Sequence, residues 1–302
     1  MFALAAATSD RPVPRVRSWS IPRQDLATQI ARLAIGSLHG ELLLHPKPGL
    51  VTPFCSGSHD DMHAGTFMRS VFSLRHYFKK ISKAGIEGAD FSELRRLGIA
   101  AERTMLRATA GVNTHRGAIF GLGLLSAAIG AVAGGGEPPD PAAIRDVLQT
   151  RWGGALQQHA AVATDPSHGQ QVALRLALSG AREEAANGFP AVFEIGLPRL
   201  QKTLAAGRDW ECACIDTLFA LMAYVSDTNV AHRGGTAGVT LVRQTAHEFL
   251  ACGATALPDW RRRVSAYGRR FVAMNLSPGG AADLLAATCL VYRASEPDAL
   301  IL

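Results

Sequence analysis

Apolar side chains recur along most of this chain at spacings of three and four residues, which places them on one face of an α-helix. One such stripe is formed by Phe67, Val71, Leu74, Phe78 and Ile81. No run of four or more residues alternates clearly between apolar and polar side chains, as a half-buried strand would. The pattern therefore predicts an all-α protein.

Capping residues divide this pattern into about ten helices. Asp25 can cap a first helix that runs to about Leu44, Asp90 begins a segment resembling a capping box, and Asp140 precedes Pro141 at a first helical position. Further helices are expected at about 209–225, 235–252, 258–274 and 279–293.

The segment 118–136 contains no charged residue and is rich in Gly and Ala. It is long enough to cross a bilayer, but its small residues and the adjacent Arg116 favour a central helix buried on all sides, with no membrane contact. We therefore expect residues 25–302 to form a single compact multi-helix domain around it. Residues 1–24 contain three prolines and are predicted to be a flexible tail.

The composition narrows the partners of this domain. The formal charge is +6 and the pI is near 9.3, which indicates acidic partners. Because the basic residues are scattered rather than interleaved with aromatics, a phosphorylated small molecule is favoured and no nucleic acid is expected. The five cysteines are an odd number in a long chain and are interpreted as reduced thiols of a cytoplasmic protein.

The stretch GVNTHRG at 111–117 stands where the chargeless segment begins. Asn113 and His115 offer polar groups, Arg116 offers a fixed charge, and a helix N-terminus beside them offers free N–H groups. An anion is the expected guest, and a simple capped loop is the alternative.

A second stretch, DTNVAHRGG at 227–235, repeats this chemistry between two other helical segments. Asn229, His232 and Arg233 repeat the types of Asn113, His115 and Arg116. We therefore predict that Arg116 and Arg233 lie across one cleft and hold a single polyanion.

Other candidates also lie at predicted helix ends. Lys47 sits on a stiff loop between prolines, His59 and Asp61 belong to an acidic and imidazole-rich cluster before a helix, and Asp227 opens the second turn. Glu102 is the carboxylate close in sequence to the first turn. Each acid could also be an ordinary cap or surface group. Carboxylates without thiolate partners suit Mg²⁺, so the set predicts a Mg-nucleotide site.

Six blocks of the chain, PKPGLV, SHxDM, GVNTHRGAIF, REEAxxGFP, DTNxxHRGG and NLSPGGxADLL, resemble the triphosphoribosyl-dephospho-coenzyme A synthases in order and spacing. The resemblance extends from about residue 25 to 290. It implies an all-helical transferase that joins ATP to 3′-dephospho-CoA: the 2′-hydroxyl displaces adenine from C1′ of the ATP ribose. The product would be a prosthetic-group precursor for malonate decarboxylase or citrate lyase.

This resemblance implies roles for the candidate residues. Mg²⁺, held by Asp61 and Asp227, would act with Lys47, Arg116 and Arg233 to grip the triphosphate. One departure stands beside Asp61, because this chain has His63 where family members commonly carry a carboxylate.

The remaining roles concern the reacting sugar. We expect Glu102 to act as the base, with His115 or His232 near the departing adenine. Further substrate contacts are expected from His59, Asn113 and Asn229.

Two other functions stay open from the sequence. A helical Mg-dependent N-glycosyl hydrolase would use water in place of the alcohol. A non-catalytic nucleotide-binding subunit of a decarboxylase assembly would bind ATP without turnover. Malonate decarboxylase is weakly favoured over citrate lyase as the destination of the product, and a homodimer is left open.

Overall fold

The chargeless segment forms helix α5 (Arg116–Gly134), which is buried along most of its length. It is the described helix that is long and apolar enough to cross a membrane, and 78% of its most apolar window is buried inside the fold. Glycines let its neighbour approach closely: a Cβ added at Gly130 would lie 2.4 Å from the Ser82 carbonyl oxygen, and one at Gly85 would lie 1.9 Å from that of Ala127. The predicted buried central helix is confirmed.

The computed structural model describes residues 23–161 and 180–296, and in these ranges it contains helices and no strand. The all-α prediction is confirmed. Of the predicted tail 1–24, residues 1–22 lie outside the described residues, and Arg23 and Gln24 begin the first helix.

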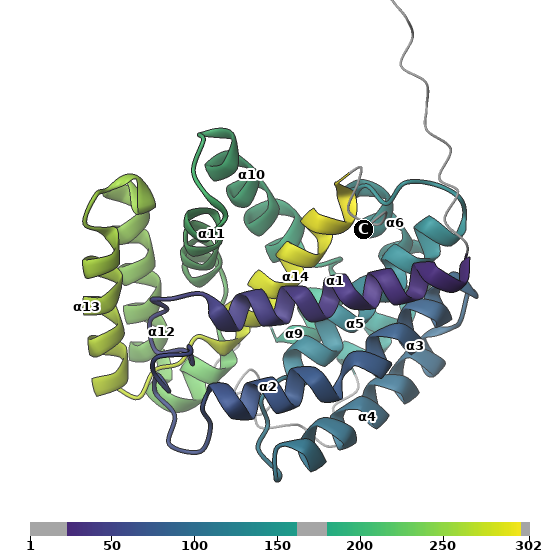
Figure 1. Ribbon diagram of the computed structural model, residues 1–302, viewed down its shortest axis with the longest axis horizontal. Helices are drawn as coiled ribbons and strands as arrows, with labels where there is room; N and C mark the ends of the chain where they lie inside the picture. Colours follow the sequence, from purple (N-terminus) through teal and green to yellow (C-terminus); the bar gives the residue numbers. More distant parts are fainter. Residues whose placement is uncertain (1–22, 162–179, 297–302) are drawn as a thin grey trace, which may run out of the picture.

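The first core surrounds α5 and is built by most of the N-terminal half (Figure 1). Its helices are α1 (Arg23–Leu43), α2 (Ala64–Ser73), α3 (Arg75–Ile86), α4 (Phe91–Ala108), α6 (Pro141–Val147), the π-helix η1 (Leu148–Trp152), α7 (Gly153–Ala161) and α9 (Ala181–Ala186).

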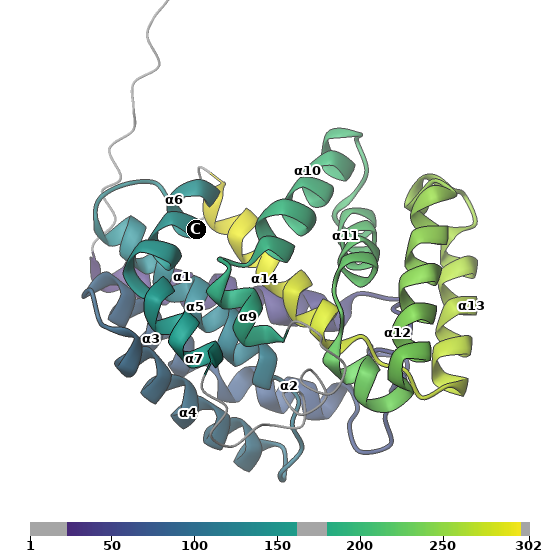
Figure 2. The same cartoon turned by 180° about the vertical axis from the view of Figure 1, so that it is seen from behind.

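The second core is built by the C-terminal half, with α12 and α13 side by side at one end of the molecule (Figures 1 and 2). Its elements are the π-helix η2 (Ala191–Gly196), α10 (Leu197–Ala205), α11 (Trp210–Tyr224), α12 (Thr228–Ala251), the 3₁₀ turn η3 (Ala254–Ala256), α13 (Trp260–Ala273) and α14 (Gly279–Ser295).

Helix α14 belongs to both cores and joins them. Leu285 and Cys289 pack in the second core, whereas Leu290 and Val291 pack in the first. Figure 2 shows α14 running diagonally between the α10–α11 pair and the helices around α5. The beginnings of α5, α12 and α14 therefore meet where the two cores adjoin.

Most predicted helix limits agree with the structure to within two residues, and two regions differ. Asp25 does not cap the first helix, because the helix already begins at Arg23 and Asp25 lies in its first turn. In the second region, a short helical turn capped by Asp227 runs from Thr228 up to the helix expected at 235–252. Gly235, with φ 59° and ψ −158°, interrupts α12 with a kink. The second His-Arg-Gly turn is therefore a short helical turn before a kink rather than a loop.

Candidate functional site

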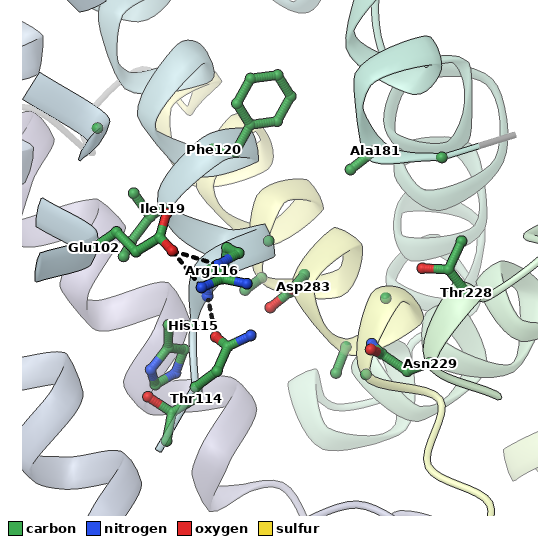
Figure 3. Close-up of a pocket in the computed structure, with 18 of the residues that line it drawn as sticks. Glu102, Thr114, His115, Arg116, Ile119, Phe120, Ala181, Thr228, Asn229 and Asp283 are labelled. Atoms are coloured by element: carbon green, nitrogen blue, oxygen red, sulfur yellow. Dashed lines mark hydrogen bonds and ion pairs between the residues drawn. The ribbon is translucent and has the colours of Figure 1, made fainter. Parts of the chain in front are cut away.

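A cavity of about 1070 Å³ lies where the two cores adjoin. Its walls come from α1, α4 and the beginnings of α5, α12 and α14. Arg116 from the first His-Arg-Gly turn and Arg233 from the second both line it. The two turns, which are more than 100 positions apart in the sequence, thus open on one cavity, and Figure 3 shows residues of both around it.

Asn113 and Arg116 form the first turn's polar face. The Asn113 side-chain oxygen accepts a hydrogen bond from the Arg116 backbone N–H at 3.2 Å. The Arg116 Nε donates to Glu102 Oε1 at 2.5 Å, and a second guanidinium nitrogen contacts the same oxygen. Glu102, which was predicted to be the base, is therefore held in an ion pair at the cavity wall (Figure 3).

His115 lies inside the wall, almost fully buried. Thr114 donates to the Ser70 hydroxyl at 2.7 Å, and that hydroxyl lies 2.7 Å from His115 Nδ1. The Ser70 oxygen has two lone pairs, so it can accept from a protonated Nδ1 as well as donate to an unprotonated one. Burial, followed by the nearby charge of Lys47, lowers the pKa of His115 to about 3. The ring is therefore neutral at physiological pH.

Asp227 opens the second turn as a double cap. One oxygen accepts from the N–H groups of Asn229 and Val230, and the other accepts from those of Gly280 and Ala281. Burial raises the pKa of the carboxyl against the opposing effect of these bonds. With these four backbone hydrogen bonds Asp227 joins the beginning of α12 to the beginning of α14, and its role as a metal ligand stays a prediction.

Arg233 is fixed by three groups on other segments. It donates to the Ser58 carbonyl at 2.6 Å and to Asn275 Oδ1 at 2.7 Å, and it lies 3.0 Å from His59 Nδ1. The other His59 nitrogen lies 2.9 Å from the Ser277 hydroxyl. Burial, then the charge of Arg233, lowers the pKa of His59. His59 and Arg233 therefore form one ordered wall of the cavity.

Four predicted residues are not among those that line the cavity, and one of them is Asp227, described above. Lys47 is only 5% exposed, and its ammonium contacts the carboxylate and the carbonyl of Glu41. It was predicted to help grip the triphosphate and instead is paired with Glu41, which does line the cavity. His232 is exposed on α12 and is not a lining residue, and Asp61 has a 61% exposed side chain beside His59. By contrast, Asn229 does line the cavity.

The sequence prediction missed Asp283 as a site residue. Its carboxylate lies in the cavity wall, close to Gly117 of the first turn (Figure 3). Burial and then the charges of Glu41 and Asp227 raise its pKa well above the usual value. The NLSPGGxADLL block contains this residue, but a lone acid in an apolar helix gave no separate signal.

A resident metal cage does not fit the donor set. In residues 23–161 and 180–296, no group of three or more His, Cys, Asp or Glu side chains is arranged to hold a metal ion. Of the predicted pair, Asp61 does not line the cavity, and the carboxylate of Asp227 accepts hydrogen bonds from backbone N–H groups.

An all-α fold with a large cavity of fixed cations, imidazoles and carboxylates defines the class of protein: a helical enzyme for a phosphorylated substrate. Residues 27–301 match the ATP:dephospho-CoA triphosphoribosyl transferase family, and the chain belongs to that family. The family gives the chain triphosphoribosyl-dephospho-CoA synthase activity, which is a transferase activity.

Several relatives that share one name align with nearly the whole chain. The probable 2-(5''-triphosphoribosyl)-3'-dephosphocoenzyme-A synthase of Pseudomonas fluorescens is 41% identical over 284 residues, which is 92% of this chain and 96% of the relative. Proteins of the same name from Pseudomonas syringae and Acinetobacter calcoaceticus are 43% and 38% identical, covering 92% and 88% of this chain and 95% and 91% of their own. No solved structure matches the chain.

Proposed function

We propose that the enzyme transfers the 5-triphosphoribosyl group of ATP to the 2′-hydroxyl of 3′-dephospho-CoA and releases adenine. The observation that carries this proposal is the meeting of two similar turns at one cavity, with Arg116 and Arg233 both in its lining. A volume of about 1070 Å³ is at the upper end of small-molecule sites, as expected where two nucleotide substrates meet.

The triphosphate is the part of ATP that the two turns suit. It carries about four negative charges, of which Mg²⁺ offsets two, so at least two fixed cations are needed in a partly dry site. Arg116, Arg233 and the N-terminus of α5 meet this need. Mg²⁺ enters in this proposal as part of the Mg-ATP substrate. Binding energy from the unreactive triphosphate then positions C1′ for reaction.

His115 is suited to the departing base. In the tautomer in which Ser70 donates to Nδ1, the neutral ring carries its proton on Nε2 and can donate a hydrogen bond to adenine while a positive charge develops on the ribose. It does not act as an imidazolium acid, because burial keeps the ring neutral.

The test is mass spectrometry of the products from ATP, Mg²⁺ and 3′-dephospho-CoA. We expect adenine and the triphosphoribosyl adduct in equal amounts, with no phosphate or pyrophosphate. Adenine release without the acceptor would identify the N-glycosyl hydrolase alternative. Tight ATP binding without turnover would identify the non-catalytic one.

The same proposal places the enzyme in the cytoplasm, where its product supplies a prosthetic group. Malonate decarboxylase and citrate lyase are the two destinations that the family resemblance implies. Complementation of strains that lack the corresponding synthase of either system distinguishes them: growth restored on malonate or on citrate identifies the destination.

A further inference from the structure

Four carboxylates line the described part of the cavity, and three of them already have partners. Glu41 is paired with Lys47, Glu102 with Arg116, and Glu183 accepts the backbone N–H of Gly180. Asp283 has no hydrogen bond or ion pair with any other described residue. It is therefore the lining carboxylate within 23–161 and 180–296 that is available to a substrate proton.

Asp283 is also placed between the two His-Arg-Gly turns. Its Oδ2 faces Gly117 so closely that a Cβ added there would lie 2.1 Å from this oxygen. In Figure 3 its side chain lies between Arg116 on one side and Asn229 on the other. A donor that contacts both turns therefore also lies against Asp283.

The charges around Asp283 make it a good proton acceptor. Burial is the main cause of its raised pKa, and Glu41 from α1 and Asp227 at the start of α12 add to it by repelling the negative form. The cations nearby, Lys47 and Arg116, are paired with Glu41 and Glu102. A carboxylate whose pKa lies closer to neutral accepts a proton more readily during reaction than an ordinary surface acid does.

We infer that Asp283 is the general base of the transfer, a catalytic role that rests on the proposed function. The 2′-hydroxyl oxygen of the acceptor forms a bond to C1′ of the ATP ribose, and its proton passes to Asp283. The electron pair of the C1′–N9 bond leaves with adenine, which takes up a proton from water. Asp283 then returns its proton to solvent, so the step is balanced and needs no other reactant.

Glu102, the base expected from the sequence, is less suited to this task. Its Oε1 accepts two guanidinium contacts from Arg116. Protonation of Glu102 would break this ion pair and release Arg116 from its position. The structure gives Glu102 the role of a positioning residue for Arg116.

The decisive variant is Asp283→Asn, which keeps the shape of the side chain. We expect kcat to fall by about 10²- to 10⁴-fold, with KM for ATP and for dephospho-CoA within a few-fold of wild type. The exposed Asp146 on α6 offers a matched control, and Asp146→Asn should leave kcat unchanged. A far-UV spectrum and a melting curve for each variant separate loss of chemistry from loss of fold.

A second variant distinguishes a base from a structural or metal-binding group. Asp283→Ala should recover part of its activity when formate is added, because a small anion can occupy the vacated space and accept the proton. Recovery by excess Mg²⁺ instead would make Asp283 a metal ligand and overturn the inference. So would a kcat of Asp283→Asn within threefold of wild type. Failure of the wild-type enzyme to release adenine would instead refute the proposed function itself.

Discussion

At the scale of the residue, burial decides which ionisable group can do what. His115 and Asp283 lie in one cavity wall, and burial moves their pKa values in opposite directions, down for the imidazole and up for the carboxyl. Both shifts favour the neutral form. The wall therefore holds an imidazole that stays neutral and a carboxyl whose pKa lies well above its usual value.

The buried His115 should make the fold sensitive to acid. Its pKa is about 3 when folded and about 6.5 when unfolded, so below pH 6.5 the unfolded chain binds the extra proton. The stability contributed by its neutral form is complete above pH 6.5 and declines as the pH falls towards 3. Urea titrations at pH 7.5 and 5 measure how much free energy of unfolding is lost between the two pH values. We expect this loss to be smaller for His115→Asn than for wild type. His247→Asn, an exposed site on α12, should keep the wild-type loss; equal losses in all three would contradict this.

Asp283 should show the opposite pH dependence. Its folded pKa is raised above the ordinary 3.8, so the folded protein is penalised as the pH rises through the folded pKa. We expect Asp283→Asn to melt higher than wild type at pH 8, on the order of a few °C, with the difference vanishing near pH 4. A variant that melts lower than wild type at pH 8 would show that the ionised side chain is stabilised in the fold.

At the scale of the element, the site is assembled by helix beginnings that close contacts lock together. Asp227 caps α12 and also binds the first N–H groups of α14, so one side chain fixes two helix ends. Gly117 lets the beginning of α5 approach Asp283 on α14. The relative positions of α5, α12 and α14, and therefore of the two turns, depend on these contacts.

The cap predicts a cost in stability for Asp227→Asn. The amide keeps one acceptor oxygen but replaces the other by an NH₂ group, which leaves two buried N–H donors without a partner. We expect a loss of about 1–3 kcal/mol in the free energy of unfolding, measured by urea titration. Asp140→Asn at the exposed start of α6 should cost less. Full stability combined with a changed Mg²⁺ requirement would restore the metal-ligand role.

The close approach at Gly117 predicts a loss of activity for Gly117→Ala. The added methyl group would lie 2.1 Å from Asp283 Oδ2, so the carboxylate has to move. We expect kcat to fall at least tenfold, since a misplacement of about 1 Å commonly costs more than that, with KM for ATP little changed. Gly121→Ala on the same helix meets only Phe189, at 3.7 Å, and should retain activity. Equal kcat values for the two variants would exclude the positioning role.

At the scale of the whole molecule, the cavity exists because two cores adjoin along α14. Arg116 comes from the first core and Arg233 from the second. Arg233 also ties α12 to the Ser58 and Asn275 segments, which places it at the junction. A ligand that contacts both arginines therefore bridges the cores, and its binding stabilises the whole molecule by mass action.

If one ligand bridges the two arginines, we expect that a positive charge alone, without the guanidinium shape, is not sufficient for normal ATP binding. We expect Arg116→Lys and Arg233→Lys each to raise KM for ATP by about tenfold, because Lys loses the planar fork that holds two phosphate oxygens. ATP should also raise their melting temperatures less than that of wild type. The matched control is Arg262→Lys, at a largely exposed side chain. Wild-type KM values in both site variants would remove the arginines from the triphosphate site.

Much of the fold could be predicted from local patterns. The helical spacing of apolar residues predicted the all-α class. The absence of charged residues from 118–136 predicted that α5 is buried, because an apolar surface on every side of a helix has to be covered. Caps such as Asp140 marked helix beginnings correctly because capping depends on residues only a few positions apart. The repeated His-Arg-Gly turns also pointed to one cavity, although only their residue types were visible in the sequence.

What the tertiary structure decided is the partner of each polar group. The sequence determined that Lys47, Glu102 and Asp227 are ionisable, but not which groups they pair with. In the fold, Lys47 pairs with Glu41 and Glu102 with Arg116, while Asp227 accepts hydrogen bonds from four backbone N–H groups. The same packing left Asp283 without a partner among the described residues. Charge and helical period are properties of neighbouring residues in the chain, whereas burial and pairing depend on contacts between helices as far apart in the chain as α1 and α14, so only the folded molecule determines which acid is available for chemistry.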